Sequence, residues 1–185
     1  MSQMSWTERL ITAQSDGTAV TAAAATTLLP ASAKFTLPPN YFKFLGQQLE
    51  VRASGRISSV ITTPGTARFQ LLLGAAIVFD SQAILLDSVA AHTNVHWQLE
   101  LLLTLRVLGA TANLMGSGRF ISEDILGVPA TAPKGALIAL LPWNAAPAVG
   151  ANFDSGASQV VDLSFTQTAA TGSIQLHQYS LIAPN

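Results

Sequence analysis

Apolar and polar residues alternate over the stretch from Val95 to Val107, where every second residue is apolar. The positions between them form a mainly polar row: His96, Gln98, Glu100, Leu102, Thr104 and Arg106. Successive side chains of a strand point to opposite faces, so this period of two predicts a half-buried strand roughly 40 Å long at about 3.3 Å per residue. A glycine-containing break at Leu108–Thr111 follows. We therefore expect Ala112–Ile121 to return as the second strand of a long hairpin at the centre of a sheet.

The same alternation predicts strands at Gln47–Val60 and Thr66–Gly74. Their inward residues are expected to be Leu49, Val51, Ala53, Gly55, Ile57, Ala67, Phe69, Leu71 and Leu73. Shorter strands are expected at Ala76–Phe79, Ile84–Val89, Gly135–Leu141, Gln159–Gln167 and Ser173–Ile182. Eight to ten strands at hairpin spacing, with no helix beyond one or two turns, predict an all-β protein. We expect an antiparallel β-sandwich or jelly-roll-like barrel.

Two segments interrupt the strands with aromatic or loop-forming residues. Pro39 is placed to open a helical turn and Gly46 to close it. The apolar residues between them, Tyr41, Phe42, Phe44 and Leu45, are expected to plug one end of the sandwich; a ligand-binding aromatic box is the alternative. Proline and glycine predict loops at Ser122–Gly135 and Ala145–Ser158.

The first 33 residues read differently from the rest of the chain. A short strand is expected within Glu8–Gln14 and another at Thr26–Leu29. Thr18–Thr27 contains almost only Ala, Thr and Val and has no apolar period. We interpret residues 1–33 as an extended N-terminal arm with a short strand, and residues 34–185 as a single β-sandwich domain. A disordered terminus is the alternative.

Charged residues make up only 10% of the 185 residues, against about 25% in a typical soluble domain. Either the surface is rich in Ser, Thr and Ala, or the chain buries much of its surface against copies of itself or a larger assembly. A net charge of −1 offers no basic patch for nucleic acid. The apolar runs are too short to span a membrane. With no cysteine and no signal peptide evident, folding in the cytoplasm is expected.

Candidate catalytic groups are few. His92 and His96 are four residues apart but straddle a loop and a strand start, so a zinc site is not indicated, and His177 stands alone. Glu50 and Glu100 resemble the carboxylate pair of a glycosidase, but they lie among arginines, which favours cross-strand ion pairs. We therefore predict no catalytic, cofactor-binding or metal-binding residue, and no cofactor.

Three further features of the sequence have both a functional and a structural interpretation. Gly116-Ser-Gly118 lacks the following helix that a phosphate loop needs. Trp143-Asn144 is the one candidate for sugar binding by a loop aromatic, and it is equally suited to anchor a loop. Leu102 is an apolar residue in an otherwise polar row, which can mark a contact with another subunit.

Several blocks of the sequence resemble small virion proteins of tailed bacteriophages, of the head decoration (cement) type or tail-associated. These blocks are Phe35–Gly46, Gln47–Ser58, Trp97–Leu101 and Gly116–Phe120, and the resemblance covers roughly residues 35–121. Proteins of that kind are typically jelly-roll or related β-barrel trimers that brace the capsid lattice. The resemblance implies no catalytic residue.

We therefore expect a non-enzymatic structural protein of the virion, made in the host cytoplasm. It would be an oligomeric capsid decoration subunit, a homotrimer, whose partners are itself and the major capsid protein or another virion protein, with the arm helping attachment. Neither nucleic acid nor membrane is an expected partner. The alternatives are a tail or baseplate structural protein with host-glycan binding, and a carbohydrate-binding or carbohydrate-active β-sandwich protein.

Overall fold

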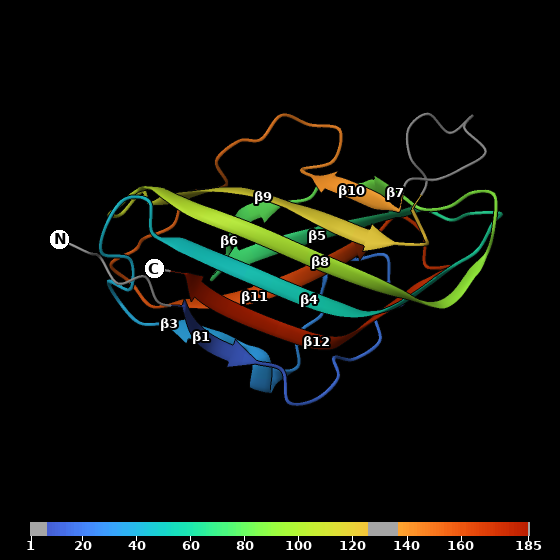
Figure 1. Cartoon of the computed structure of the whole chain (residues 1–185), viewed down its shortest axis with the longest axis horizontal. Helices are drawn as coiled ribbons and strands as arrows, with labels where there is room; N and C mark the ends of the chain where they lie inside the picture. Colours follow the sequence, from blue (N-terminus) through green and yellow to red (C-terminus); the bar gives the residue numbers. More distant parts are fainter. Residues whose placement is uncertain (1–6, 126–136, 185) are drawn as a thin grey trace.

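The computed structural model describes residues 7–125 and 137–184, which form two facing β-sheets (Figure 1). The strands are β1 (Thr7–Thr12), β2 (Thr26–Thr27), β3 (Phe35–Leu37), β4 (Gln48–Ser59), β5 (Thr66–Leu73), β6 (Ala76–Asp80), β7 (Ile84–Leu85), β8 (His92–Val107), β9 (Asn113–Ser122), β10 (Ile138–Leu141), β11 (Gln159–Gln167) and β12 (Ser173–Pro184). The helical structure in these residues is one 3₁₀ turn, η1 (Ala31–Ala33).

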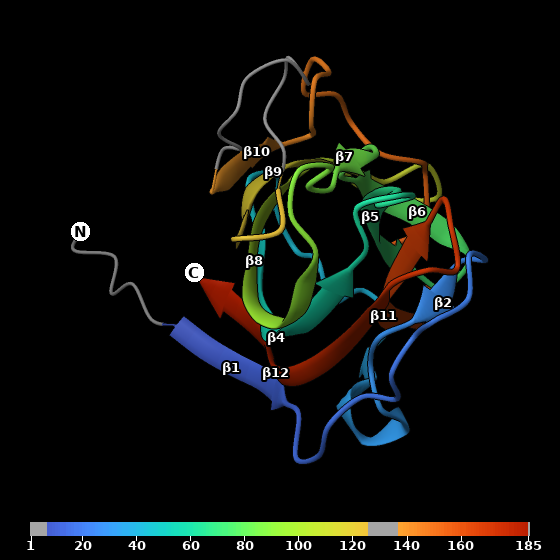
Figure 2. The same cartoon turned by 90° about the vertical axis from the view of Figure 1, so that its right-hand side faces the viewer.

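The strand order defines an antiparallel sandwich. One six-stranded sheet has the order β1-β12-β4-β8-β9-β10, and the other sheet has the order β2-β11-β5-β6, with β3 and β7 paired to β11 and β5. Figure 2 shows the two sheets end-on. The pairs β1–β12, β2–β11, β4–β8 and β5–β6 are nested in the sequence, which is the jelly-roll-like pairing of a long hairpin folded over on itself. The strands β9 and β10 do not belong to these nested pairs and add two strands to the first sheet next to β8.

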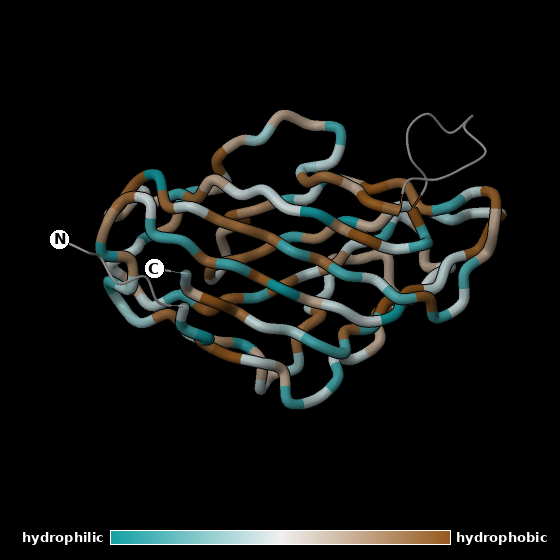
Figure 3. The backbone as a smooth tube through the Cα atoms, in the orientation of Figure 1, coloured by the Kyte–Doolittle hydropathy of each residue, from teal (hydrophilic) through white to brown (hydrophobic). Residues whose placement is uncertain are grey.

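The core lies between the sheets and is built from the alternating residues of the long strands. Teal and brown segments follow each other along β4 and β8 in Figure 3. All the inward apolar residues predicted for Gln47–Val60 and Thr66–Gly74 are buried. Phe69 lies at the centre, with its ring centroid 5.0 Å from that of Phe120, 5.3 Å from Phe165 and 5.7 Å from Trp97. The Trp97 indole N–H donates to the carbonyl of Arg56, so its polar atom is paired as well.

The predicted fold class and central hairpin are confirmed. β8 and β9 pair from Trp97–Ser122 to Val107–Asn113, and the turn between them contains Gly109 at φ 97°. β8 begins three residues before the predicted start, at His92, because its first residues extend the pairing with β4 as far as Ser59. The described residues form twelve strands rather than eight to ten; β2 and β7 lie within the strands predicted at Thr26–Leu29 and Ile84–Val89 but are only two residues long.

The helical turn predicted between Pro39 and Gly46 is wrong. This segment has turns but no helix, and Asn40, directly after Pro39, has a φ of 56°, which a right-handed helix does not allow. The expected plug is only half formed. Phe42 is buried against Phe153, with ring centroids 5.7 Å apart, whereas Phe44 and Leu45 are exposed.

The described part of the N-terminal segment, residues 7–33, lies along the sandwich of its own chain. β1 pairs with β12 at one border of the six-stranded sheet, and Val20 bridges Ile174 and is buried. Leu28 and Leu29 are also buried in the core. Val20, within the Thr18–Thr27 stretch that has no apolar period, is therefore part of the core. The first six residues of the arm, and Gly127, Pro129 and Pro133 of the loop predicted at Ser122–Gly135, lie outside the described residues.

Among the described residues, none belongs to a helix of the length and apolar character needed to cross a membrane.

Candidate functional site

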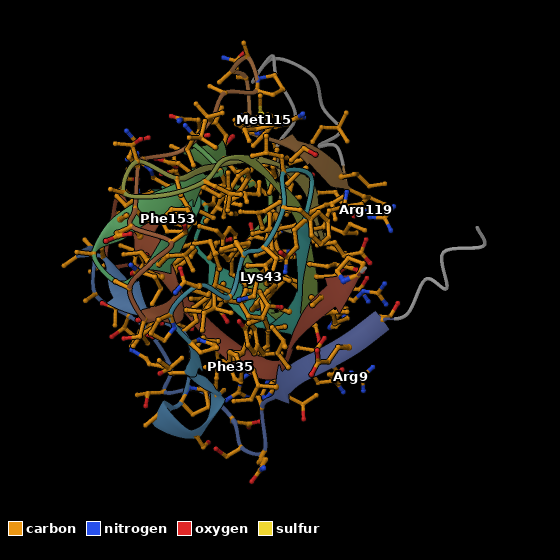
Figure 4. The ribbon with its side chains drawn as sticks, turned by 90° about the vertical axis from the view of Figure 1, so that its left-hand side faces the viewer. Arg9, Phe35, Lys43, Met115, Arg119 and Phe153 are labelled. Carbon is orange, nitrogen blue, oxygen red and sulfur yellow. The ribbon has the colours of Figure 1, made fainter. Side chains whose placement is uncertain are left out.

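The outer face of the six-stranded sheet holds most of the charged strand residues. Five of the six arginines of the chain lie on this sheet, and the sixth, Arg68, lies on β5. Cross-strand register places one continuous row across the whole sheet: Leu140, Arg119, Glu100, Arg52, Ser180 and Thr12. Figure 4 shows Arg9 and Arg119 on this outer side, toward opposite borders of the sheet. This face is the candidate functional surface.

Glu50 and Glu100, the two carboxylates considered as a glycosidase pair, each form an ion pair with an arginine. Glu100 accepts from Arg119 across β8 and β9, with Nη2 at 2.6 Å and Nε at 2.8 Å from the same carboxylate oxygen. Glu50 accepts from Arg52, two residues along β4. Arg52 in turn stands opposite Glu100 in the strand register. The Glu100–Arg119 pair is a cross-strand ion pair of the kind that the sequence predicts, whereas the Glu50–Arg52 pair lies within one strand.

An apolar groove of about 610 Å³ lies at the β10 border of this face. Its apolar lining comes from Leu101, Leu102, Leu140, Leu141 and Pro147. Leu140 is 74% exposed and Ile138, two residues earlier on the same face, is 51% exposed. Both belong to β10, the last strand of the sheet, so exposed aliphatic side chains coincide with a strand edge that has no partner strand among the described residues. Ile138 and Leu140 of β10 therefore add exposed apolar surface beside Leu102, the residue that the sequence analysis names as a mark of a subunit contact.

A second hollow, the polar pocket, lies toward the other border of the same face. It has a volume of about 480 Å³ and is walled by β1, β12, β4 and β8. Its polar side chains are Arg9, Thr12, Arg52, Ser54, Gln98, Glu100, Gln178 and Ser180. Glu100 also borders the apolar groove, so the two hollows are adjacent.

The histidines do not gather into a metal site. His92 lies 3.0 Å from an Asp87 carboxylate oxygen and His177 lies 2.9 Å from Asp16, whereas His96 stands opposite Arg56 in the β4–β8 register. Across residues 7–125 and 137–184, the side chains form no cluster of three or more metal-ligating groups.

Among the described residues, Asp124 is the most enclosed charged residue, with no exposed surface. Its Oδ1 accepts from the Ser59 hydroxyl at 2.8 Å and from the Asp87 amide at 3.2 Å, while Oδ2 has no partner in the described structure. Burial raises the pKa of Asp124. Burial also opposes ionisation of Asp87, but hydrogen bonds from His92 and two backbone amides outweigh it and lower the pKa of Asp87.

The remaining sequence candidates have structural roles. Trp143 packs against the core and its amide donates to the Ser81 carbonyl at 2.8 Å. These contacts favour the interpretation of Trp143 as a residue that anchors its loop. Gly116 and Gly118 lie inside β9. A Cβ at Gly116 would stand 2.4 Å from the Phe79 ring, so glycine is needed there for the two sheets to approach.

Sequence reasoning missed Arg9, Gln178 and Leu140 as parts of the candidate surface. Arg9 and Gln178 lie beside register shifts in β1 and β12, and a bulge of this kind has no reliable sequence signal. Leu140 belongs to a wholly apolar stretch, Ala136–Leu141, in which the sequence does not distinguish the residues of the inner face from those of the outer face. In the structure only Ala139 and Leu141 face the core.

Comparison with family models, with curated proteins and with solved structures gave no match for this chain.

Proposed function

We propose that this chain is a non-enzymatic structural subunit of a phage particle, a homotrimeric decoration protein that braces the head. One observation carries the self-association: the apolar groove and the exposed aliphatic residues of β10 lie together at the β10 border of the sheet. Apolar surface concentrated in this way is typical of an interface core, and its flanks carry charges of both signs in ion pairs.

The rest of the proposal is supported by composition and resemblance. A charged fraction of 10% leaves wide uncharged surface, which closed symmetric assembly can bury. The phage assignment and the trimer come from the blocks between residues 35 and 121 that resemble virion proteins. That resemblance covers head decoration and tail-associated proteins alike, and of the two locations we propose the head. The arginine partners of Glu50 and Glu100 support the non-enzymatic role.

Sedimentation velocity tests the self-association. We expect the wild type to sediment as a trimer at micromolar concentration and Leu140→Glu to sediment as a monomer, because a carboxylate would be buried without a partner. Leu45→Glu is the matched control, since Leu45 is 61% exposed in a turn remote in sequence from β10. It should remain trimeric. A monomeric wild type, or a trimeric Leu140→Glu variant, would contradict the proposed interface.

Mass spectrometry of purified particles tests the location. Heads and tails of the particle are separated and digested, and peptides of this chain are quantified in each fraction. We expect them with the heads, at a fixed ratio to the major capsid protein. Their presence in the tail fraction alone would favour the tail or baseplate alternative, and their absence from both would refute the virion assignment.

A further inference from the structure

We infer that the polar pocket between β1, β12, β4 and β8 is a binding site for a carboxylate-bearing saccharide, such as a sialic or uronic acid. Its volume of about 480 Å³ falls in the range of about 300–1,000 Å³ that small-molecule sites occupy. The inference does not rest on self-association, because its argument uses the lining of the polar pocket and not the exposed residues of β10.

Two irregular strands shape the pocket. The pairing of β1 with β12 shifts between Arg9 and Ile11, and the pairing of β12 with β4 shifts between Leu176 and Gln178. Bulges of this kind redirect side chains and are frequent beside binding sites. Here they lie on adjacent strands, and the residues beside them, Arg9 and Gln178, both line the pocket. A regular pair of strands would have given a flat face instead.

The side chains around the pocket have unused hydrogen-bonding capacity. Within the described structure, five of them make no side-chain hydrogen bond to the protein: Thr12, Ser54, Gln98, Gln178 and Ser180. Hydroxyl and carboxamide groups both donate and accept, as sugar hydroxyls do. The floor is formed by Ala53, Leu99 and Tyr179, whose side chains are buried in the core, so it offers backbone rather than an aromatic face. A ring with several hydroxyls fits this lining better than a nucleobase, which needs a stacking partner.

The charges select an acidic sugar. Arg52 forms an ion pair with Glu50, and Glu100 forms one with Arg119, so the charges of these two lining residues are already compensated. Arg9 is exposed and forms no salt bridge with any residue of the described structure. A guanidinium binds a carboxylate in a planar two-bond arrangement, which makes Arg9 the group that receives the ligand's acid.

Nuclear magnetic resonance titration tests the inference with two acidic probes and their controls. The probes are α2,3-sialyllactose and tri-galacturonic acid, the neutral counterpart is lactose, and sodium acetate is the bare carboxylate. We expect at least one acidic probe to bind with a dissociation constant of about 1 mM or below and to shift amide signals of β1, β4, β8 and β12. Lactose should bind at least about tenfold more weakly, and acetate should not saturate the site.

Substitution of Arg9 provides the second readout. Arg9→Gln should weaken binding of the acidic probe about tenfold or more, with an unchanged circular dichroism spectrum. Arg106→Gln is the matched control, because Arg106 is an exposed arginine on β8 that does not line the pocket. It should bind as the wild type does.

Three outcomes would overturn the inference. They are failure of both acidic probes to bind, binding of acetate as tight as that of the sugars, and undiminished binding in Arg9→Gln. The titration measures sugar binding through the amide signals of the pocket strands. A protein that proves to be a monomer would therefore refute the proposed trimer but would leave the test of sugar binding valid.

Discussion

At the scale of single residues, the aromatic centre of the core is the most sensitive position. Phe69 is fully buried and lies next to Trp97, Phe120 and Phe165. We expect Phe69→Ala to lower the free energy of unfolding by about 3–5 kcal/mol, because it removes buried apolar surface and leaves a cavity. Urea denaturation measures this. Phe44→Ala is the control, since Phe44 is 54% exposed, and its effect should stay within about 0.5 kcal/mol.

A second residue-scale prediction concerns pH. The pKa of Asp124 is raised above its usual 3.8, so the folded chain holds this proton more tightly than the unfolded chain. The resulting stabilisation is complete below the unfolded pKa and is lost as pH rises through the folded pKa. Asp124→Asn keeps the Oδ1 acceptor for Ser59 and carries no charge. We expect its free energy of unfolding, relative to wild type, to increase between about pH 4 and pH 7.

Asp87 should show the opposite dependence of stability on pH in the same experiment. Its pKa is lowered, so its contribution to stability is present above 3.8 and is lost as pH falls through the folded pKa. Asp87→Asn should therefore cost more stability at neutral pH than in acid. Urea denaturation over a pH series measures both variants, and parallel curves for the two would contradict this assignment.

At the scale of elements, β1 closes one border of the six-stranded sheet by pairing with β12. Its Leu10 and Ile11 pack against the core, although they are only partly buried. We expect removal of residues 1–13 to leave the sandwich folded but to lower its melting temperature by several degrees, since each 1 kcal/mol corresponds to about 2–4 °C at this size. Differential scanning calorimetry checks this.

A longer deletion should behave differently. Removing residues 2–25 also takes Val20, which is buried and bridged to Ile174 on β12. We expect a larger loss of melting temperature than for the shorter deletion. Equal melting temperatures for the two truncated chains would show that the segment after β1 contributes nothing to the fold. The exposed β12 edge would also favour aggregation, which light scattering detects.

At the scale of the whole molecule, the assembly proposed above makes stability depend on concentration. Association that occurs only between folded chains stabilises them by mass action. We expect the melting temperature of the wild type to rise with protein concentration and that of Leu140→Glu to be constant. A melting temperature independent of concentration in both would contradict self-association.

The sequence by itself determined the strands and the class of fold. Alternation over Gln47–Val60, Thr66–Gly74 and Val95–Val107 has no helical counterpart, because only a strand places every second side chain on one face. The buried residues of β4, β5 and β8 follow directly from it. The cross-strand pairing of Glu100 with an arginine was also foreseeable, since opposite charges recur along one face of neighbouring strands, whereas Glu50 pairs with Arg52 of its own strand.

Only the tertiary structure decided which faces meet and where the surface is hollow. Alternation says that one face of β10 is buried, but an apolar stretch cannot show that Leu140 is on the other. Positive φ at Asn40 turned an expected helical turn into a loop. The polar pocket joins Arg9, Arg52, Gln98 and Gln178 from four strands, so it depends on strand order and on two bulges. Those follow from packing between residues distant in sequence, to which local patterns are insensitive.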